Sequence, residues 1–391
     1  MYRKLIDLST GYNSGDMSEI MLDPQRQVRA REYARLRRRL MLVDLGMGAF
    51  YCLAWLAFGW SQQLSDWLAG WTANQVLLVA GFGAVFAGVY AVINLPLSYY
   101  SGFILPHHYE LSTQTLRGWV VDQLKGGLIG ALFGLVMLEI IYAVLRAAPQ
   151  TWWLWAALIL VIFNILMANL APVLLFPIFY KFKPLEEEYA ELAARLMRLA
   201  AQAGTRVRGV YQFDMSSRTK AANAALTGLG NTRRILLGDT LLKEFTPDEI
   251  ETVLAHELGH HVHRDIPMGI LIESLITLIG LYLASLALNW GVTVFGFTGP
   301  ADIAALPLFV LVIGFYSLLT MPLGNAYSRW RERRADEYAL QATHNGAAYA
   351  AALTRLANQN LADVDPEPWV EFLLYSHPAL GKRIAMAQKQ V

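Results

Sequence analysis

Residues Thr246–Asn289 read TPDEIETVLAHELGHHVHRDIPMGILIESLITLIGLYLASLALN and join two kinds of sequence without a break. The first part begins with a capping box, because Thr246 is followed three residues later by Glu249, and Pro247 suits the first helical position. The last part, 267–289, is an apolar run long enough to cross the hydrocarbon core of a membrane. A capped polar helix therefore leads directly into a predicted membrane span.

The composition agrees with a membrane protein. Of the 391 residues, 55% are hydrophobic and only 16% are charged, whereas a soluble domain carries about 25% charged residues. The net charge of +1 gives no reason to expect nucleic acid as a partner. The single cysteine, Cys52, cannot form an internal disulfide and lies in an apolar run, so we expect it to be buried.

Six apolar runs of about twenty residues predict six membrane spans. They cover roughly 41–60, 77–98, 126–146, 152–175, 267–289 and 303–323. The predicted organisation is an N-terminal region with a basic helix (1–40), spans one to four (41–177), an insert (178–266), spans five and six (267–324) and a C-terminal part (325–391).

The basic residues orient these spans. The helix predicted over 24–40 contains seven arginines, whereas the loop between the first two spans and the loop near 291–300 contain neither Lys nor Arg. Since Lys and Arg concentrate on the cytoplasmic side of a membrane, we expect the N-terminal region, the insert and the C-terminal part to lie in the cytoplasm. The predicted location is a prokaryotic cell membrane, with the lipid bilayer as a partner.

The insert is predicted to mix α and β structure. EEEYAELAARLMRLAAQAG (186–204) has helical spacing with Gly204 as its stop. VRGVYQF (207–213) and RRILLGDTLL (233–242) resemble short strands, and a turn is expected near Gly228–Asn231.

An H-E-x-x-H pattern lies inside the capped helix. His256 and His260 are four residues apart, so both imidazoles emerge on one helical face and can share a metal ion. Glu257 is placed beside them, where a carboxylate can take a proton from an attacking water. The alternative is a polar helix face with solvated histidines. The cap and the helical register favour a zinc site, with one Zn²⁺ per chain.

A catalytic zinc site usually has three protein ligands. His261 points to another side of the helix, and His263 shares the face of the pair, but three ligands from one straight helix would surround a metal poorly. Glu332 and Asp336, one turn apart just after the sixth span, are the better candidates, although their spacing alone also suits a salt-bridged surface helix. We predict Glu332 as the third ligand and Asp336 as the residue that orients a ligand histidine.

Five segments, in this order, resemble the type I CaaX prenyl endopeptidases, integral-membrane zinc proteases of the gluzincin kind. They are HHYELSTQTLRGWVVDQLKG (107–126), RTKAANAALTGLGNTRRILLGDTLL (218–242), HELGHHVHRD (256–265), NAYSRWRERRAD (325–336) and SHPALGKR (376–383). The resemblance implies a mainly α-helical membrane protein whose spans form a barrel around a chamber, with a cytosolic α+β metalloprotease domain. It implies the same zinc ligands and the same base.

The resemblance also assigns roles that the residues alone do not. His377 and Arg383 are expected to bind the substrate or the tetrahedral oxyanion, although His377 before a proline also suits a turn. Asn223 and Ala224 match the start of a strand along which an extended substrate would add as a further strand. The alternative for Asn223 is a turn residue.

Two features depart from the family. Its members have seven spans, and here the basic helix over 24–40 stands where the first would lie, so we expect six walls and a wider lateral opening. The continuation HHVHRD (260–265) is more similar to that of the heat-shock membrane metalloproteases, which degrade misfolded membrane proteins. Four polar residues within spans are expected to face the barrel interior, with interhelical hydrogen bonding as the alternative for the asparagines: Glu139, Asn164, Asn169 and Glu273.

The expected function is that of a zinc-dependent membrane endopeptidase. Its substrate would be a peptide or protein, prenylated or membrane-embedded, and the family reaction removes the C-terminal tripeptide of a prenylated protein. The alternatives are a quality-control protease of the heat-shock type and, outside the enzymes, a metal transporter.

Overall fold

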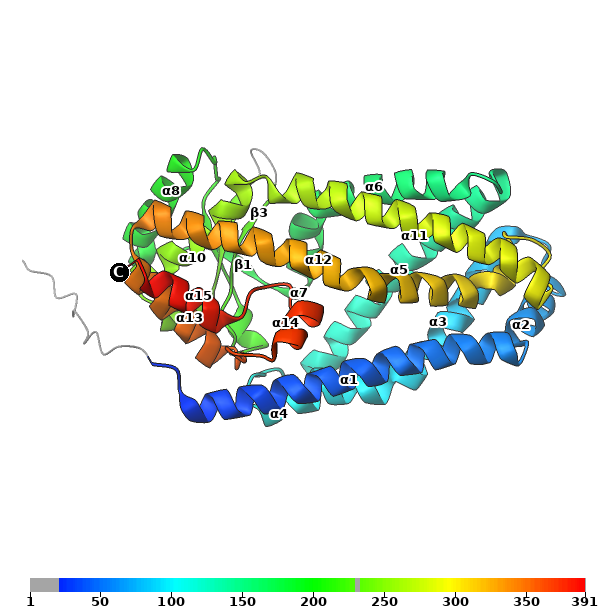
Figure 1. Ribbon diagram of the computed structural model, residues 1–391, viewed down its shortest axis with the longest axis horizontal. Coiled ribbons are helices and arrows are strands. Elements are labelled where there is room, and N and C mark those ends of the chain that lie inside the picture. Colours follow the sequence, from blue (N-terminus) through cyan, green and yellow to red (C-terminus); the bar gives the residue numbers. More distant parts are fainter. Residues whose placement is uncertain (1–20, 229–232, 391) are drawn as a thin grey trace, which may run out of the picture.

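The computed structural model describes residues 21–228 and 233–390. Residues 1–20 of the predicted N-terminal region lie outside this part, and so do positions 229–231 of the predicted turn. Figure 1 shows an elongated molecule in which long helices run side by side and the small sheet lies at one end.

Six helical segments among the described residues are long and apolar enough to span a membrane, as predicted. Two of them are prolonged by short turns, η1 (Tyr100–Ile104) with α4 (Leu105–His108) and η2 (Ala171–Leu175) with α7 (Phe176–Phe179). The main helices are α1 (Pro24–Ala57), α3 (Gln75–Tyr99), α5 (Leu116–Ala147), α6 (Trp152–Leu170), α11 (Asp265–Phe295) and α12 (Leu306–Thr343). The short helix α2 (Trp60–Ala69) connects α1 to α3.

Two predicted boundaries fall inside continuous helices. The helix α1 contains both the basic segment 24–40 and the first span, and the Asp23 side chain caps it by accepting from the backbone N–H groups of Gln25 and Arg26. The helix α12 runs through the boundary at 324–325 and carries both Glu332 and Asp336. Membrane and protease parts are therefore joined by rigid helices at these points.

The insert folds around a four-stranded sheet. Its strands are β1 (Phe182–Pro184), β2 (Val210–Phe213), β3 (Ala224–Thr227) and β4 (Arg234–Gly238), in the order β1-β2-β4-β3. The β2–β4 pair is parallel and the other two pairs are antiparallel. The predicted strand 233–242 is thus split, since its second half forms α9 (Asp239–Glu244).

Helices pack around this sheet. The predicted helix of the insert is α8 (Ala190–Gln202), and Gly204 follows it with a positive φ of 66° that favours glycine. The H-E-x-x-H helix is α10 (Pro247–Val262), and both hydrogen bonds of its predicted capping box are present. The C-terminal part adds α13 (Gly346–Gln359), α14 (Pro368–Leu374) and α15 (Leu380–Gln388). Fully buried Leu254 and Leu258 place one face of α10 in the shared core.

A cavity of about 920 Å³ lies among α1, α3, α5 and α12 in the membrane part. Its walls are apolar and small, with seven glycines, and Asp44 is the one charged residue among them. Cys52 also lines it and is buried, and its burial confirms the prediction from its apolar surroundings.

The polar residues predicted to face the interior do not line this cavity. Glu139, Asn164, Asn169 and Glu273 are all absent from its walls, although Glu139 Oε1 is buried within the protein, so their expected orientation toward the barrel interior stays a prediction. The Asn169 side chain instead donates to the carbonyl of Ile165, one turn earlier in its own helix (2.6 Å). A helix that is apolar all round gives no sign of which face points inward.

Candidate active site

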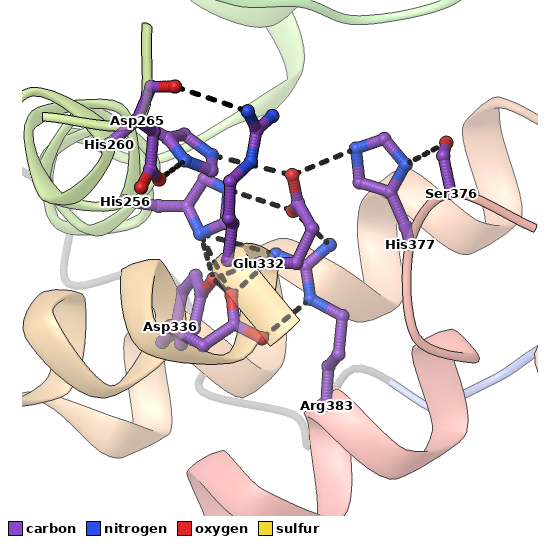
Figure 2. A network of polar contacts seen from close by, with 10 residues as sticks. His256, His260, Asp265, Glu332, Asp336, Ser376, His377 and Arg383 are labelled. Atoms are coloured by element: carbon purple, nitrogen blue, oxygen red, sulfur yellow. Dashed lines mark hydrogen bonds and ion pairs between the residues drawn. The ribbon is translucent and has the colours of Figure 1, made fainter. Parts of the chain in front are cut away.

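The site is assembled where α10 crosses α12. Gly259 packs so closely against α12 that a Cβ atom added to it would lie 2.9 Å from the Cα of Ala335 and 3.1 Å from its carbonyl oxygen. This contact brings Glu332, one turn before Asp336 on α12, opposite the two histidines of α10. In Figure 2, Glu332 lies between the histidine pair and His377.

The three predicted ligands are together. One ligand atom each from His256, His260 and Glu332 can be chosen so that all lie within 4.8 Å of one another. The Nε2 of His256 is 3.3 Å from Glu332 Oε2, and the Nε2 of His260 is 3.4 Å from Glu332 Oε1. Neither His261 nor His263 belongs to this group.

Each histidine is held through its other ring nitrogen. The Nδ1 of His256 is 2.8 Å from Asp336 Oδ1, which is the contact predicted for Asp336. The Nδ1 of His260 is 2.8 Å from Oδ2 of Asp265, the first residue of α11. These carboxylates favour the proton on Nδ1, which leaves both Nε2 atoms facing Glu332.

Sequence reasoning missed Asp265 and Tyr349. Asp265 is the last residue of HHVHRD and is 3% exposed, and its position five residues after His260 is the signal in the sequence that could have identified it. Tyr349, on α13, donates its hydroxyl to Asp336 Oδ1 (2.6 Å) and is 1% exposed. No local pattern marks Tyr349, because the fold alone brings α13 to this point.

Arg383 and His377 both reach the cluster. The guanidinium of Arg383 donates to both oxygens of Asp336, through Nε (2.9 Å) and Nη2 (2.6 Å), while its Nη1 is 3.9 Å from Glu332 Oε2. His377 Nε2 is 3.3 Å from Glu332 Oε1, and its Nδ1 is 2.9 Å from Ser376 Oγ. Arg383 is buried, whereas the His377 side chain is 58% exposed, so His377 is the more accessible of the two.

The electrostatics favour a positive charge among the ligands. Burial alone would lower the pKa of His256, but the close carboxylates of Asp336 and Glu332 outweigh it and raise that pKa to about 9. Burial would likewise lower the pKa of His260, and its contacts with Glu332 and Asp265 raise it. The negative carboxylates that favour a proton on these imidazoles would equally favour a metal cation at the two Nε2 atoms.

Glu257 has the opposite environment. Burial raises the pKa of its carboxyl, and the neighbouring His256 and His260 only partly offset the rise. A carboxyl with a raised pKa is suited to accept and return a proton.

A carboxylate oxygen without a hydrogen-bond partner also suits this cluster to a metal ion. Glu332 Oε2 is buried and has no hydrogen-bond partner among the described residues. A buried carboxylate oxygen of this kind normally has a partner, and two imidazole nitrogens with one carboxylate form a known catalytic zinc ligand set.

The predicted substrate strand lies beside this helix. Ala224 is the first residue of β3, and β3 is an edge strand of the sheet that also packs against α10. The carbonyl of Asn223 accepts from the backbone N–H of Gly238 (2.9 Å), so Asn223 is extended alongside β4.

Comparison with known families matches nearly the whole chain. The family described as "Peptidase family M48" matches residues 186–391, more than half of the chain. The family described as "CAAX prenyl protease N-terminal, five membrane helices" matches residues 16–181.

Individual proteins are similar over most of their length. An "Uncharacterized metalloprotease YhfN" of Bacillus subtilis is 30% identical over 94% of this chain and 87% of its own. "CAAX prenyl protease 1" of Saccharomyces cerevisiae is 31% identical over 78% of this chain and 70% of its own.

A solved structure has the same fold. The crystal structure of S. mikatae Ste24p superimposes with a TM-score of 0.83 at 24% identity, covering 95% of this chain and 90% of that one. The H-E-x-x-H helix, the six spans and these matches all indicate a metallopeptidase of the membrane. The chain belongs to peptidase family M48 and is an integral-membrane metallopeptidase of the CaaX prenyl protease type.

Proposed function

We propose that this chain uses a zinc ion to hydrolyse a peptide bond near an apolar or prenyl group that enters the membrane cavity. The observation that carries the proposal is α12, because this one helix lines the cavity with Leu306, Val310 and Leu318 and carries Glu332 at its other end. The apolar cavity walls suit a hydrocarbon chain, and the cluster suits hydrolysis.

His256, His260 and Glu332 would hold the metal, with Asp336 and Asp265 fixing the two imidazoles. A bound zinc ion supplies Lewis-acid polarisation of the scissile carbonyl and activates water. Arg383 holds Asp336 in place by two hydrogen bonds, so its main contribution is to the position of His256.

Glu257 is the proposed base. It takes a proton from the attacking water and later delivers it to the leaving amine, for which its raised pKa is suited. The exposed His377 would donate a hydrogen bond to the carbonyl oxygen as negative charge develops there, a role supported by its position 3.3 Å from Glu332. Such a donor is typically worth about 3 kcal/mol of transition-state stabilisation.

The free edge of the sheet is the proposed substrate guide. An extended peptide that pairs with β3 from Ala224 onward would run beside α10, and its backbone would be held whatever its side chains. We further propose that the protease part faces the cytoplasm of a prokaryotic cell. Support comes from the arginine-rich start of α1 and from the bacterial relative.

The test compares two peptides and three proteins. The purified full chain in detergent, its Glu257→Gln variant and a Glu251→Gln control on the same helix are offered a farnesylated CaaX peptide and the same peptide without the lipid. We expect the control and the parent chain to cleave the farnesylated form preferentially. Glu257→Gln should retain bound zinc and lose activity by about a thousandfold or more, at the upper end of the range for a general base.

Other outcomes decide between the alternatives. Equal cleavage of both peptides would contradict the prenyl specificity and favour the quality-control protease suggested by HHVHRD. Full activity of Glu257→Gln would contradict the assigned base, and metal transport by that variant would favour the transporter.

A further inference from the structure

A second cavity, of about 490 Å³, opens between α12, α14 and α15. The three proposed metal ligands do not line it. Asp336 and Arg383, the ion pair behind His256, form part of its wall, so the cavity lies next to the catalytic cluster on the side away from the metal ligands. Figure 1 shows its helix α14 between α12 and α1.

The charges in this cavity do not balance. Arg383 is paired with Asp336, and Lys382 is paired with Glu371 (2.5 Å). Arg329 forms no salt bridge among the described residues, although it lies close enough to Glu371 to interact with its charge, and its Nη1 donates to the backbone carbonyls of α14 and the following turn, at 2.7–3.2 Å.

Arg333 is the free cation of the cavity. It is exposed, lines the wall, and has neither an ion pair nor a hydrogen bond within the part of the chain that the structure describes. Together with Arg329 it leaves an excess of two positive charges, and a guanidinium fork fits the oxygens of a phosphate group.

The cavity begins at the depth of lipid headgroups. The apolar stretch of α12 ends at Asn325, the first polar residue after it, and Trp330 follows roughly five residues later, or about 7.5 Å along the helix. Headgroup regions extend about 5–8 Å beyond the hydrocarbon core on each side. Trp330 and Phe372 in the cavity wall are each at least half exposed, as aromatic residues are at a membrane interface.

We propose that this cavity binds the phosphate group of an anionic membrane lipid, with Arg333 as its main contact. Trp330 and Phe372, which also line the cavity, would contact the glycerol and the upper acyl chains. A free phosphate ion carries the same chemistry but could not use the aromatic walls, so we expect the lipid to be the ligand. This site is independent of the prenyl specificity proposed above.

The experiment measures lipid binding to the full chain in detergent by native mass spectrometry. The probes are short-chain phosphatidylglycerol, phosphatidylcholine with the same chains, and inorganic phosphate. The variants are Arg333→Gln, Arg333→Lys, and Arg198→Gln as the matched control on the exposed surface of α8. Thermal unfolding without lipid checks that all four proteins fold alike.

We expect phosphatidylglycerol to bind in preference to phosphatidylcholine. Arg333→Gln should weaken its binding by roughly tenfold, the effect of losing one charge-assisted hydrogen bond. Arg333→Lys should lie between this variant and the parent chain, and Arg198→Gln should match the parent.

Three results would overturn the proposal. Equal weakening by Arg333→Gln and Arg198→Gln would mean that the effect is one of net charge. Equal binding of the two lipids would exclude headgroup recognition. Inorganic phosphate binding as tightly as the lipid would assign the cavity to a free anion.

Discussion

The contact of α12 with α10 and the cavity wall at its other end are packed in opposite ways. At the catalytic end, Gly259 lets α10 approach so closely that one added carbon atom would meet the backbone of Ala335 at 2.9 Å. At the cavity end, Gly130 and Gly134 of α5 and Gly314 of α12 have nothing within 4 Å of the place where a Cβ would be. The same residue type therefore closes one contact and leaves the other open.

The difference follows from what each end has to do. Hydrolysis needs the histidines and Glu332 at fixed separations, and a misplacement of 1 Å can lower a rate about a hundredfold. A cavity for a flexible apolar chain needs volume instead, and small side chains in its walls provide it. Substitutions at the two ends should therefore have unequal effects.

The largest effect is expected from Gly259→Ala. The new methyl group meets backbone atoms that cannot rotate away, so α10 and α12 must separate and carry the histidines away from Glu332. We expect kcat/KM to fall about a hundredfold and bound zinc to fall below one per chain, as measured by peptide cleavage and metal analysis. Gly130→Ala is the control and should be nearly unchanged. Equal effects of the two substitutions would remove the contrast between the ends.

Asp265→Asn tests whether the carboxylate next to His260 contributes to metal binding. The amide keeps the shape of the side chain but loses the negative charge that holds the Nδ1 proton of His260. We expect zinc affinity to fall about 10–100-fold, measured by competition with a chelator of known affinity. Asp248→Asn, on the exposed start of α10, is the control. An unchanged affinity would mean that Asp265 has a purely structural role.

Gly130→Leu tests the open end. It fills part of the cavity, so kcat/KM for a farnesylated peptide should fall about tenfold, which corresponds to roughly two lost CH₂ contacts. Cleavage of the same peptide without the lipid should not change. Gly126→Leu places the same side chain on α5 outside the cavity wall and serves as the control. Equal losses with both peptides would contradict the proposed role of the cavity.

The smallest effect, on thermal stability, is expected at Glu371, which accepts hydrogen bonds from the backbone of Ala379 and from Lys382. Burial would raise the pKa of this carboxyl, but the Lys382 ammonium and the backbone N–H of Ala379 outweigh it and hold the pKa below its usual 4.5. Because the pKa is depressed in the folded chain, this contribution to stability is present above pH 4.5 and is lost as the pH falls through the folded value.

Glu371→Gln should therefore flatten the loss of stability on acidification. We expect the thermal midpoint of the parent chain in detergent to lie a few °C above that of the variant at pH 7 and to converge with it below pH 4.5. Parallel profiles would show that Glu371 keeps an ordinary pKa.

The sequence predicts the features of this molecule that depend on periodicity or on spacing. The six spans, the capped α10 and the group of His256, His260 and Glu332 follow from apolar length, capping chemistry and helical register. What it could not predict is which faces of the helices meet. Asn169 is an example, because it does not line the cavity although a polar side chain is unfavourable in lipid. Tyr349 is another, because it donates to Asp336 from a helix that carries no motif.

The continuity of α12 has a consequence for substrate choice. Between Leu318, in the cavity wall, and Glu332 there are roughly fourteen residues, or about 21 Å of regular helix. Under the proposed function, the lipid chain and the residues that join it to the scissile bond would together cover this length. The length of that connection, rather than the side chains within it, would then decide where the substrate is cut.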